Sequence, residues 1–194
     1  MTTAKNTAIL EGVRIIDLTS VVFGPLATQM LGDLGADVIK VEAPEGDLLR
    51  QVQPSNNKLM GAAFLGANRN KRSVVLDLKE RTGQDQLRKL LKDADVMISS
   101  IRPAALARLS LDPETLRRAY PDLITVSATG FGQDGPYGKR PGVDQIAQGM
   151  GGLMSITGLP GQGPVRVGIP ICDLTSGMFL AQGILIALLD REVT

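Results

Sequence analysis

The stretch GVRIIDLTSVVFGPLATQMLGDLGADVIKVE, residues 12–42, decides the fold. Its first part, residues 12–18, is apolar enough for a buried strand, and residues 36–42 form a second strand-like run. Between them, residues 24–35 place apolar side chains at helical spacing, with Pro25 early in the helix. A strand, a helix and another strand in this order predict two parallel strands joined by a right-handed crossover.

The rest of the chain repeats this alternation. Further strands are expected at residues 73–78, 95–100 and 165–172 and in the first part of 122–132. Helices are expected at residues 80–94, 103–109 and 113–120, in the first part of 142–158, and after Asp173. We therefore predict one α/β domain over residues 1–194, with a Rossmann-like, mostly parallel sheet and helices on both faces.

The composition narrows the class of protein. A net charge of +1 gives no indication of a nucleic-acid or membrane partner, and residues 1–12 lack the apolar core of a secretory signal. The longest apolar stretch, residues 177–189, is shorter than the roughly 20 residues that span a bilayer and predicts a buried core helix. Cys172 is the only cysteine, which excludes an intramolecular disulfide and favours a cytoplasmic location.

The chain contains no histidine. This excludes Ser-His and Cys-His nucleophile pairs and histidine-ligated metals, and we predict no metal site. Cys172, with no histidine to activate it, is expected to be a buried and inert thiol. Any catalysis therefore depends on carboxylates, amines, hydroxyls or backbone groups.

A dinucleotide site is the first candidate function. Glu42 stands at the end of the second predicted strand, where an acidic residue binds the ribose in Rossmann enzymes. The first turn, however, reads SVVFGPLA instead of the glycine pattern that lets a pyrophosphate approach the backbone. The sequence predicts the fold but not NAD binding.

Two basic segments are candidates for binding an anion. Arg69, Lys71 and Arg72 precede a predicted strand, and their pattern favours a solvated charge run over a phosphate site. Residues 129–148 form a long loop rich in glycine and proline, with Lys139 and Arg140 near its end. Long loops after sheet strands tend to carry function, and an idle surface loop is the alternative.

Asp173 lies between two apolar runs, residues 165–172 and 178–189. Aspartate is a favoured N-cap residue, and the local pattern by itself favours that structural role. A carboxylate at a helix start that follows a strand is also where open α/β sheets bind ligands. A helix N-terminus favours the anion, and a carboxylate nucleophile needs no general base. Both interpretations stay open on the local pattern.

Several long motifs together resemble one family, the class III CoA-transferases of the carnitine and bile-acid type. The resemblance is to the N-terminal part of these enzymes and covers almost the whole chain. The motifs are LEGVRIIDLT, GPLATQMLGDLGADVIKVEAPEGD, NRNKRSVVLDL, ADVMISSIRPAALARL, TGFGQDGPYGKRPGVDQIAQGMGGLMSITG and PVRVGIPICDLTSGMFLAQGILIALL.

The resemblance implies a Rossmann-like large domain, an interlocked homodimer and transfer of CoA from an acyl-CoA to a small carboxylic acid. CoA enters as part of a substrate, and no permanently bound cofactor is implied. The family's catalytic aspartate falls on Asp173, which would form a mixed anhydride and then an aspartyl-CoA thioester. The resemblance also implies that Arg69, Lys71 and Arg72 lie near the phosphates of CoA. The positions that match CoA contacts are Val22, Phe23, Leu76, Asp77, Leu78, Lys79, Ser100, Ile101, Arg102, Arg108, Lys139, Arg140 and Asp144.

Departures from the family pattern narrow the activity. Val143 stands where the racemase branch has a catalytic histidine, which disfavours α-proton exchange. Val22 and Ala43 replace a glutamine and an arginine of the oxalate-specific branch. The alternatives are a CoA-binding module without catalysis and, less favoured, an acyl-CoA racemase.

The length of the chain is its largest departure from the family pattern. Family members continue through a linker into a smaller domain, which supplies a glycine-rich loop over the aspartate, and then return to the large domain. We therefore expect these 194 residues to be the N-terminal portion of a transferase, weak or inactive by itself. The acyl donor and the acceptor acid are not predicted, because the small domain shapes their pocket.

Overall fold

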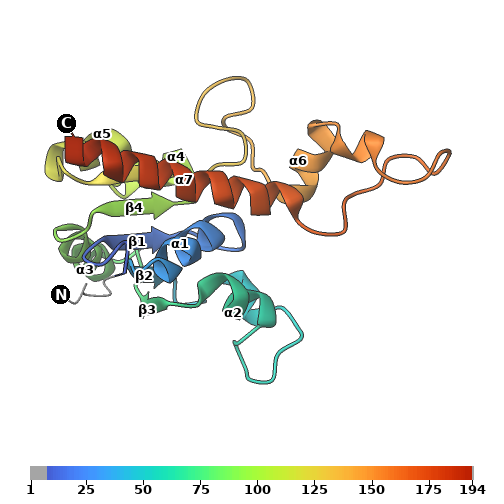
Figure 1. Cartoon of the computed structure of the whole chain (residues 1–194). Helices are drawn as coiled ribbons and strands as arrows, with labels where there is room; N and C mark the ends of the chain where they lie inside the picture. The colour runs from blue at the N-terminus through green and yellow to red at the C-terminus, as the bar shows by residue number, and fades with distance from the viewer. Residues whose placement is uncertain (1–7, 194) are drawn as a thin grey trace, which may run out of the picture.

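A computed structural model of the chain describes residues 8–193. Five strands form one parallel sheet in the order β3-β2-β1-β4-β5, which confirms the predicted Rossmann-like sheet (Figure 1). Residues 1–7, part of the N-terminal stretch in which we predict no secretory signal, lie outside the described residues. The strands are β1 (Arg14–Leu18), β2 (Asp37–Glu42), β3 (Lys71–Val75), β4 (Val96–Ser99) and β5 (Ile124–Ser127).

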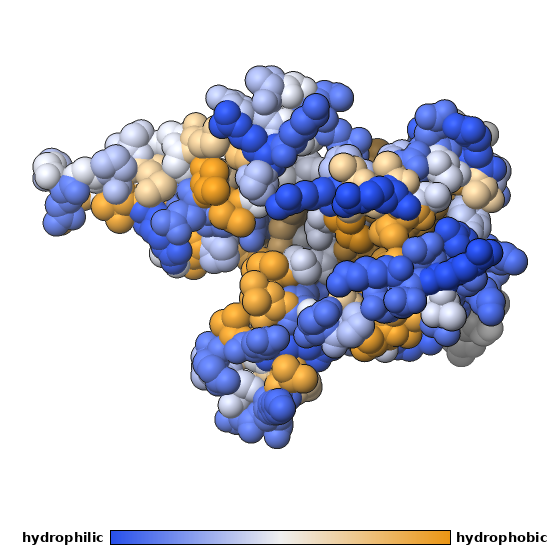
Figure 2. Space-filling model, turned by 180° about the vertical axis from the view of Figure 1, so that it is seen from behind, coloured by the Kyte–Doolittle hydropathy of each residue, from blue (hydrophilic) through white to orange (hydrophobic). Residues whose placement is uncertain are grey.

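Helices cover both faces of the sheet, as predicted. α1 and α7 pack on one face, and α3, α4 and α5 pack on the other (Figure 1). Two projections, one with α2 and one with α6, extend from this core (Figure 1), and both are also seen from behind in Figure 2. The helices are α1 (Phe23–Asp33), α2 (Ala62–Asn68), α3 (Arg81–Leu91), α4 (Pro103–Arg108), α5 (Pro113–Ala119), α6 (Asp144–Met150) and α7 (Ile171–Val193), with 3-10 turns η1 (Leu48–Gln51) and η2 (Leu153–Ile156).

The sheet has a hydrophobic core on each face, because successive side chains of a strand point to opposite faces. Ile15 of β1 packs with Leu31 of α1 and Ile184 of α7, whereas Ile16 packs with Leu87 of α3 and Leu116 of α5. All six side chains are at most 2% exposed. Both faces of β1 are therefore buried, which explains why its sequence reads as a continuous apolar run instead of an alternation.

The strand predicted at residues 165–172 is wrong. The segment is irregular up to the start of α7. Pro164 precedes the segment and Pro170 lies within it, and neither has an amide hydrogen to donate to a sheet ladder. Val165 and Val167 donate their amides to residues of η2 and α6, over 3.1 and 2.8 Å. The loop is therefore held by neighbouring helices and not by the sheet.

α7 is longer than the apolar run at residues 177–189 suggested. Its length and composition alone would allow it to cross a membrane, a criterion that core helices of soluble proteins also meet. In this structure, 22% of its apolar window is buried. Its other side exposes large hydrophobic residues, such as Phe179, which is 70% exposed, and Leu189. The prediction of a buried core helix is therefore correct for one face only. The buried stripe consists of Gly177, Ala181, Ile184 and Leu188.

Gly177 lets α7 approach α1 closely, because a Cβ there would lie 2.8 Å from the carbonyl oxygen of Phe23. We expect Gly177→Ala to lower the free energy of unfolding by about 1–3 kcal/mol, since backbone has to shift. Gly183, on the same helix, has open space at its Cβ position. Gly183→Ala should therefore raise that free energy by about 0.5–1 kcal/mol through helix propensity. Urea denaturation followed by circular dichroism compares the two, and effects of the same sign would contradict the close packing.

Candidate functional site

A pocket of about 540 Å³ opens at the carboxyl ends of β1, β2, β3 and β4. Open α/β sheets bind their ligands at this edge, and the volume suits a small-molecule site. Lys79 and Arg108 are exposed at the pocket and form no ion pair within residues 8–193. They can therefore meet an anionic ligand. Six of the predicted CoA contacts line the pocket, namely Leu76, Asp77, Leu78, Lys79, Ile101 and Arg108.

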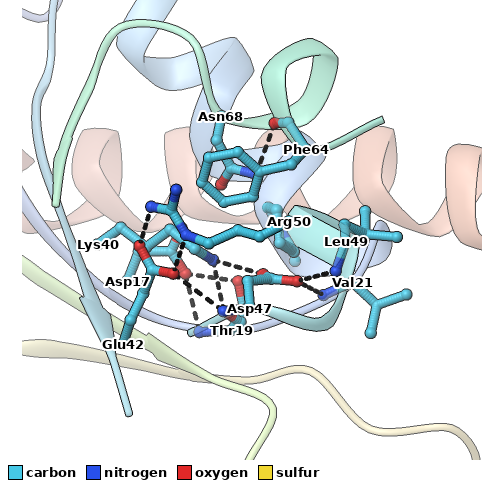
Figure 3. A network of polar contacts seen from close by, with 12 residues as sticks. Asp17, Thr19, Val21, Lys40, Glu42, Asp47, Leu49, Arg50, Phe64 and Asn68 are labelled. Atoms are coloured by element: carbon cyan, nitrogen blue, oxygen red, sulfur yellow. Dashed lines mark hydrogen bonds and ion pairs between the residues drawn. The ribbon is translucent and has the colours of Figure 1, made fainter. Parts of the chain in front are cut away.

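A buried network of charged side chains supports the pocket wall (Figure 3). The Lys40 ammonium lies 2.9 Å from the Asp47 carboxylate and donates to the carbonyl of Thr19, also over 2.9 Å. Asp17, fully buried, accepts a hydrogen bond from Lys71 over 3.0 Å. Burial by itself would raise the pKa of Asp17, but Lys71, Lys40 and two hydroxyl donors hold it below its ordinary value. Burial lowers the pKa of Lys71 to about 8, against the opposing effect of Asp17.

Both carboxylate oxygens of Glu42 accept hydrogen bonds within the chain, so Glu42 is not available to a ribose. Its carboxylate accepts two hydrogen bonds from Arg50 over 2.6 Å each, one from Ser73 over 2.5 Å and one from the Asp47 amide over 3.0 Å. Burial would raise the pKa of Glu42, but these donors lower it to about 2. The Arg50 guanidinium also lies 3.8 Å from the centre of the Phe64 ring (Figure 3). These contacts agree with the prediction against a dinucleotide site.

The turn after β1 contains a strained residue. Val21 has φ of 69°, in the left-handed region that β-branched residues rarely adopt. Its amide donates to the Asp47 carboxylate over 3.3 Å, which ties the turn to the pocket wall (Figure 3). Such strain persists where surrounding contacts enforce it, often at functional sites. The same turn leads into Val22 and Phe23, at the start of α1.

Asp173 is the third residue of α7, and its side chain is half-buried. Figure 1 shows that α7 begins beyond the edge to which the strands point. No residue of the described chain donates a hydrogen bond to the Asp173 carboxylate. Burial, together with the negative charge of Asp144, raises the pKa of Asp173 above its ordinary value. The carboxylate is therefore accessible to a substrate, and no donor among the described residues occupies it.

The cap of α7 is Asp144 and not Asp173. Oδ1 of Asp144, on α6, accepts hydrogen bonds from the amides of Cys172 and Asp173 over 2.8 and 3.3 Å. Asp173 itself lies inside the helix and follows a loop, so its expected position after a strand is wrong. The expectation that the helix N-terminus favours the Asp173 anion is also wrong, because burial and then the charge of Asp144 raise the pKa of Asp173.

Cys172 is partly exposed, whereas the sequence predicted a buried thiol. Burial and the neighbouring carboxylates of Asp144 and Asp173 raise the pKa of its thiol, so the thiolate that would react is disfavoured. Within residues 8–193, no group of three or more histidine, cysteine, aspartate or glutamate side chains could hold a metal ion.

The other predicted CoA contacts do not line the pocket. Val22 and Phe23 lie at the start of α1, where the Phe23 carbonyl faces Gly177 of α7. Lys139 and Arg140 are exposed in the loop before α6, and the Arg140 guanidinium lies 4.6 Å from the centre of the Tyr137 ring. Residues outside the pocket lining are Val22, Phe23, Ser100, Arg102, Lys139, Arg140 and Asp144.

The basic segment before β3 is engaged elsewhere. Arg69 pairs with Asp33, Arg72 pairs with Asp37 over 2.7 Å, and Lys71 belongs to the buried network. None of the three lines the pocket. The prediction that they are phosphate neighbours is therefore wrong for this pocket, because acidic partners inside the chain hold them.

Sequence reasoning missed Lys40 and Asp47 in the pocket wall and the fully buried Gln148 near α7. Lys40 did carry a signal, since it is a lone cation within the apolar strand DVIKVE. A buried lysine requires a partner, which pointed to a carboxylate such as Asp47 nearby. Gln148 carried no comparable signal.

Comparison with known proteins identifies the family. The family model described as CoA-transferase family III matches residues 10–194. The chain belongs to this family. Among similar solved structures, a CAIB/BAIF family protein from Brucella suis has a TM-score of 0.91 and is 39% identical, over 95% of this chain and 50% of that chain. Rv3272 from Mycobacterium tuberculosis has a TM-score of 0.88 and is 40% identical, over 96% of this chain and 51% of that chain.

Curated relatives carry CoA-transferase names. A succinate–glutarate CoA-transferase from Agrobacterium fabrum is 46% identical, over 93% of this chain and 47% of its own length. A formyl-CoA:oxalate CoA-transferase from Streptomyces avermitilis is 40% identical, over 97% of this chain and 46% of its own length. This family III chain thus spans about half the length of the curated relatives that it matches.

Proposed function

We propose that the protein moves CoA from an acyl-CoA thioester to a free carboxylic acid through a covalent aspartyl-CoA intermediate on Asp173. The observation that carries this proposal is the Asp173 carboxylate, which is half-buried and accepts no hydrogen bond from the described residues. Asp173 lies in the first turn of α7, a helix that begins beyond the carboxyl edge of the sheet (Figure 1). Family membership supports the reaction class.

The proposed steps need only carboxylates and the CoA thiol. An Asp173 oxygen attacks the thioester carbonyl carbon, the carbon–sulfur bond breaks, and CoA leaves as a thiolate. This step leaves the acyl group on Asp173 as a mixed anhydride. The thiolate attacks the Asp173 carbonyl carbon and releases the donor acid, which leaves an aspartyl-CoA thioester. The acceptor carboxylate then displaces CoA to form a second anhydride. The thiolate attacks the acceptor carbonyl, which yields the new acyl-CoA and restores Asp173.

This chemistry suits a chain without histidine. A carboxylate nucleophile requires no base to remove a proton, and no step changes the number of bound protons. The raised pKa of Asp173 makes its anion more basic and so a stronger nucleophile than an ordinary aspartate. The geometry around Asp173 therefore supports covalent catalysis over capping.

The test is chemical trapping. The protein is incubated with succinyl-CoA, then with hydroxylamine, and the peptides are analysed by mass spectrometry. We expect a hydroxamate on Asp173, absent in Asp173→Ala and retained in Asp93→Ala, which removes an exposed carboxylate elsewhere. Binding of succinyl-CoA without any modification of Asp173 would favour the non-catalytic alternative.

The pocket is proposed to hold the phosphate-bearing part of CoA, with Arg108 as one anion partner. We expect Arg108→Ala to weaken CoA binding about 5- to 10-fold, with a smaller effect at high salt, because exposed charge–charge contacts are screened. Arg117→Ala, on neighbouring α5 and outside the pocket, is the matched control. Isothermal titration calorimetry at two salt concentrations measures both, and equal affinities for the two variants would exclude this role of Arg108.

Two further properties remain part of this proposal. The resemblance implies an interlocked homodimer, which analytical ultracentrifugation tests directly. The single cysteine and the ordinary charge balance support a cytoplasmic location without nucleic-acid or membrane partners. Acceptor acids to compare are glutarate and oxalate, which relatives are named for.

A further inference from the structure

The first turn of α7 has no free amide. The amide of Ile171 donates to the carbonyl of Ile169 over 2.8 Å, and that of Leu174 donates to the carbonyl of Pro170 over 2.9 Å. Between them, the amides of Cys172 and Asp173 both donate to Oδ1 of Asp144. The helix start is therefore occupied by a carboxylate of the protein itself and offers no donor to a developing oxyanion.

Asp144 is itself fixed by a buried glutamine. Its Oδ2 accepts a hydrogen bond over 2.6 Å from the side-chain amide of Gln148, one turn later on α6. Gln148 is fully buried, and its oxygen accepts the amide of Val167 over 2.8 Å. The pair thus connects α6, the loop before α7 and the first turn of α7, using every oxygen of the Asp144 carboxylate.

The same arrangement places a negative charge beside Asp173. Two groups act on the Asp173 carboxylate electrostatically, Asp144 from α6 and the neighbouring Cys172 thiol. One turn later, at Gly177, α7 faces the uncharged residues Phe23 and Leu26 of α1. Within residues 8–193, no cation pairs with Asp173. A helix N-terminus ordinarily stabilises an aspartate anion in its first turn, and here Asp144 receives that stabilisation instead.

We propose that Asp144 is a positioning residue for the transfer reaction, which holds the first turn of α7 in place and keeps the Asp173 carboxylate more reactive than a helix start would allow. This inference rests on the proposed function of Asp173. It replaces the CoA contact that the resemblance implied for Asp144. Gln148 is the residue that keeps Asp144 in this orientation.

Asp144→Asn tests the proposal, because it keeps one acceptor oxygen for the α7 amides and removes the charge, although the Gln148 amide loses its acceptor. We expect the NMR titration midpoint of the Asp173 side chain to fall in this variant. The rate of Asp173 modification by succinyl-CoA at neutral pH should fall about tenfold. Asp144→Ala also removes the acceptor, so the loss should reach about 100-fold, and exchange of the Cys172 amide hydrogen should accelerate at least tenfold.

Asp134→Asn, on the exposed loop before α6, is the charge-matched control and should change none of these quantities. A folded Asp144→Asn protein with an unmoved Asp173 midpoint overturns the inference, even if Asp144→Ala fails to fold. Absence of modification in the unaltered protein overturns the proposed function instead. In that case the Asp173 midpoint and the Cys172 exchange rate still decide whether Asp144 controls this carboxylate.

Discussion

Asp173→Asn should lower the turnover number for CoA transfer at least about 10³-fold, because an amide cannot attack the thioester carbonyl. The Michaelis constant for the acyl-CoA should change little, since Asp173 does not line the pocket that holds the predicted CoA contacts. Transfer from succinyl-CoA to glutarate, followed by chromatography of the two CoA esters, measures both quantities. A variant that keeps more than a tenth of the activity would exclude Asp173 as the nucleophile.

The thermal stability of Asp173→Asn gives an independent test of the state of the Asp173 carboxylate. The folded-state pKa of Asp173 is raised, so its ionised form costs stability above that pKa, and the cost disappears as the pH falls through it. Asp173→Asn should therefore unfold at a slightly higher temperature than the unaltered protein at pH 7. The gain should be about 0.5 kcal/mol or less, because the half-exposed group is screened by solvent. The difference should vanish under acidic conditions.

A loss of stability in Asp173→Asn would instead indicate that Asp173 caps α7. A residue that capped α7 would cost about 1 kcal/mol on removal. Asp144, which accepts the α7 amides, is the position where that cost is expected. Thermal unfolding of Asp173→Asn and Asp144→Ala side by side therefore separates a reacting group from a structural one.

Asp17→Ala should lower the free energy of unfolding by about 3–5 kcal/mol, which would be the largest stability effect of any substitution proposed. The change leaves the Lys71 ammonium, whose side chain is 2% exposed, without its buried carboxylate. It also removes the acceptor for the hydroxyls of Thr19 and Thr28, over 2.5 and 2.6 Å. Urea denaturation measures the loss.

A double variant separates the ion pair from the packing. Asp17→Leu combined with Lys71→Met replaces both charges by apolar groups, and it should recover at least half of the stability lost in Asp17→Ala. CoA binding should stay close to normal if the network only supports the pocket wall. A double variant as unstable as Asp17→Ala would show that the hydroxyl hydrogen bonds, and not the charges, carry the effect.

The local sequence was sufficient wherever a segment's structure depends on its own pattern. The apolar runs of β1 and β2 and the helical spacing of α1 identified the crossover unit. The helices expected at residues 80–94 and 103–109 correspond to α3 and α4, and Pro103 is the first residue of α4. Each of these features is decided within one or two helical turns, because pleat, helical period and proline geometry act over a few residues.

The segment at residues 165–172 shows where local pattern fails. Its valines alternate with other residues as in a strand, but the partners of Val165 and Val167 lie on η2 and α6 and not on a neighbouring strand. A short apolar run specifies burial and not the partner of its backbone. The partner depends on what else surrounds the segment after folding.

By itself, the sequence of this protein determined the parallel sheet, the helices on both faces and the family motifs, whose resemblance made Asp173 the candidate nucleophile. Only the tertiary structure decided that Asp144, from another helix, receives the amides of α7 and leaves the Asp173 carboxylate without a donor. It alone also decided that the basic residues before β3 pair with acids while Lys79 and Arg108 stay open at the pocket. The physical reason is that a hydrogen bond or an ion pair depends on which groups meet in space, and these partners come from distant parts of the chain.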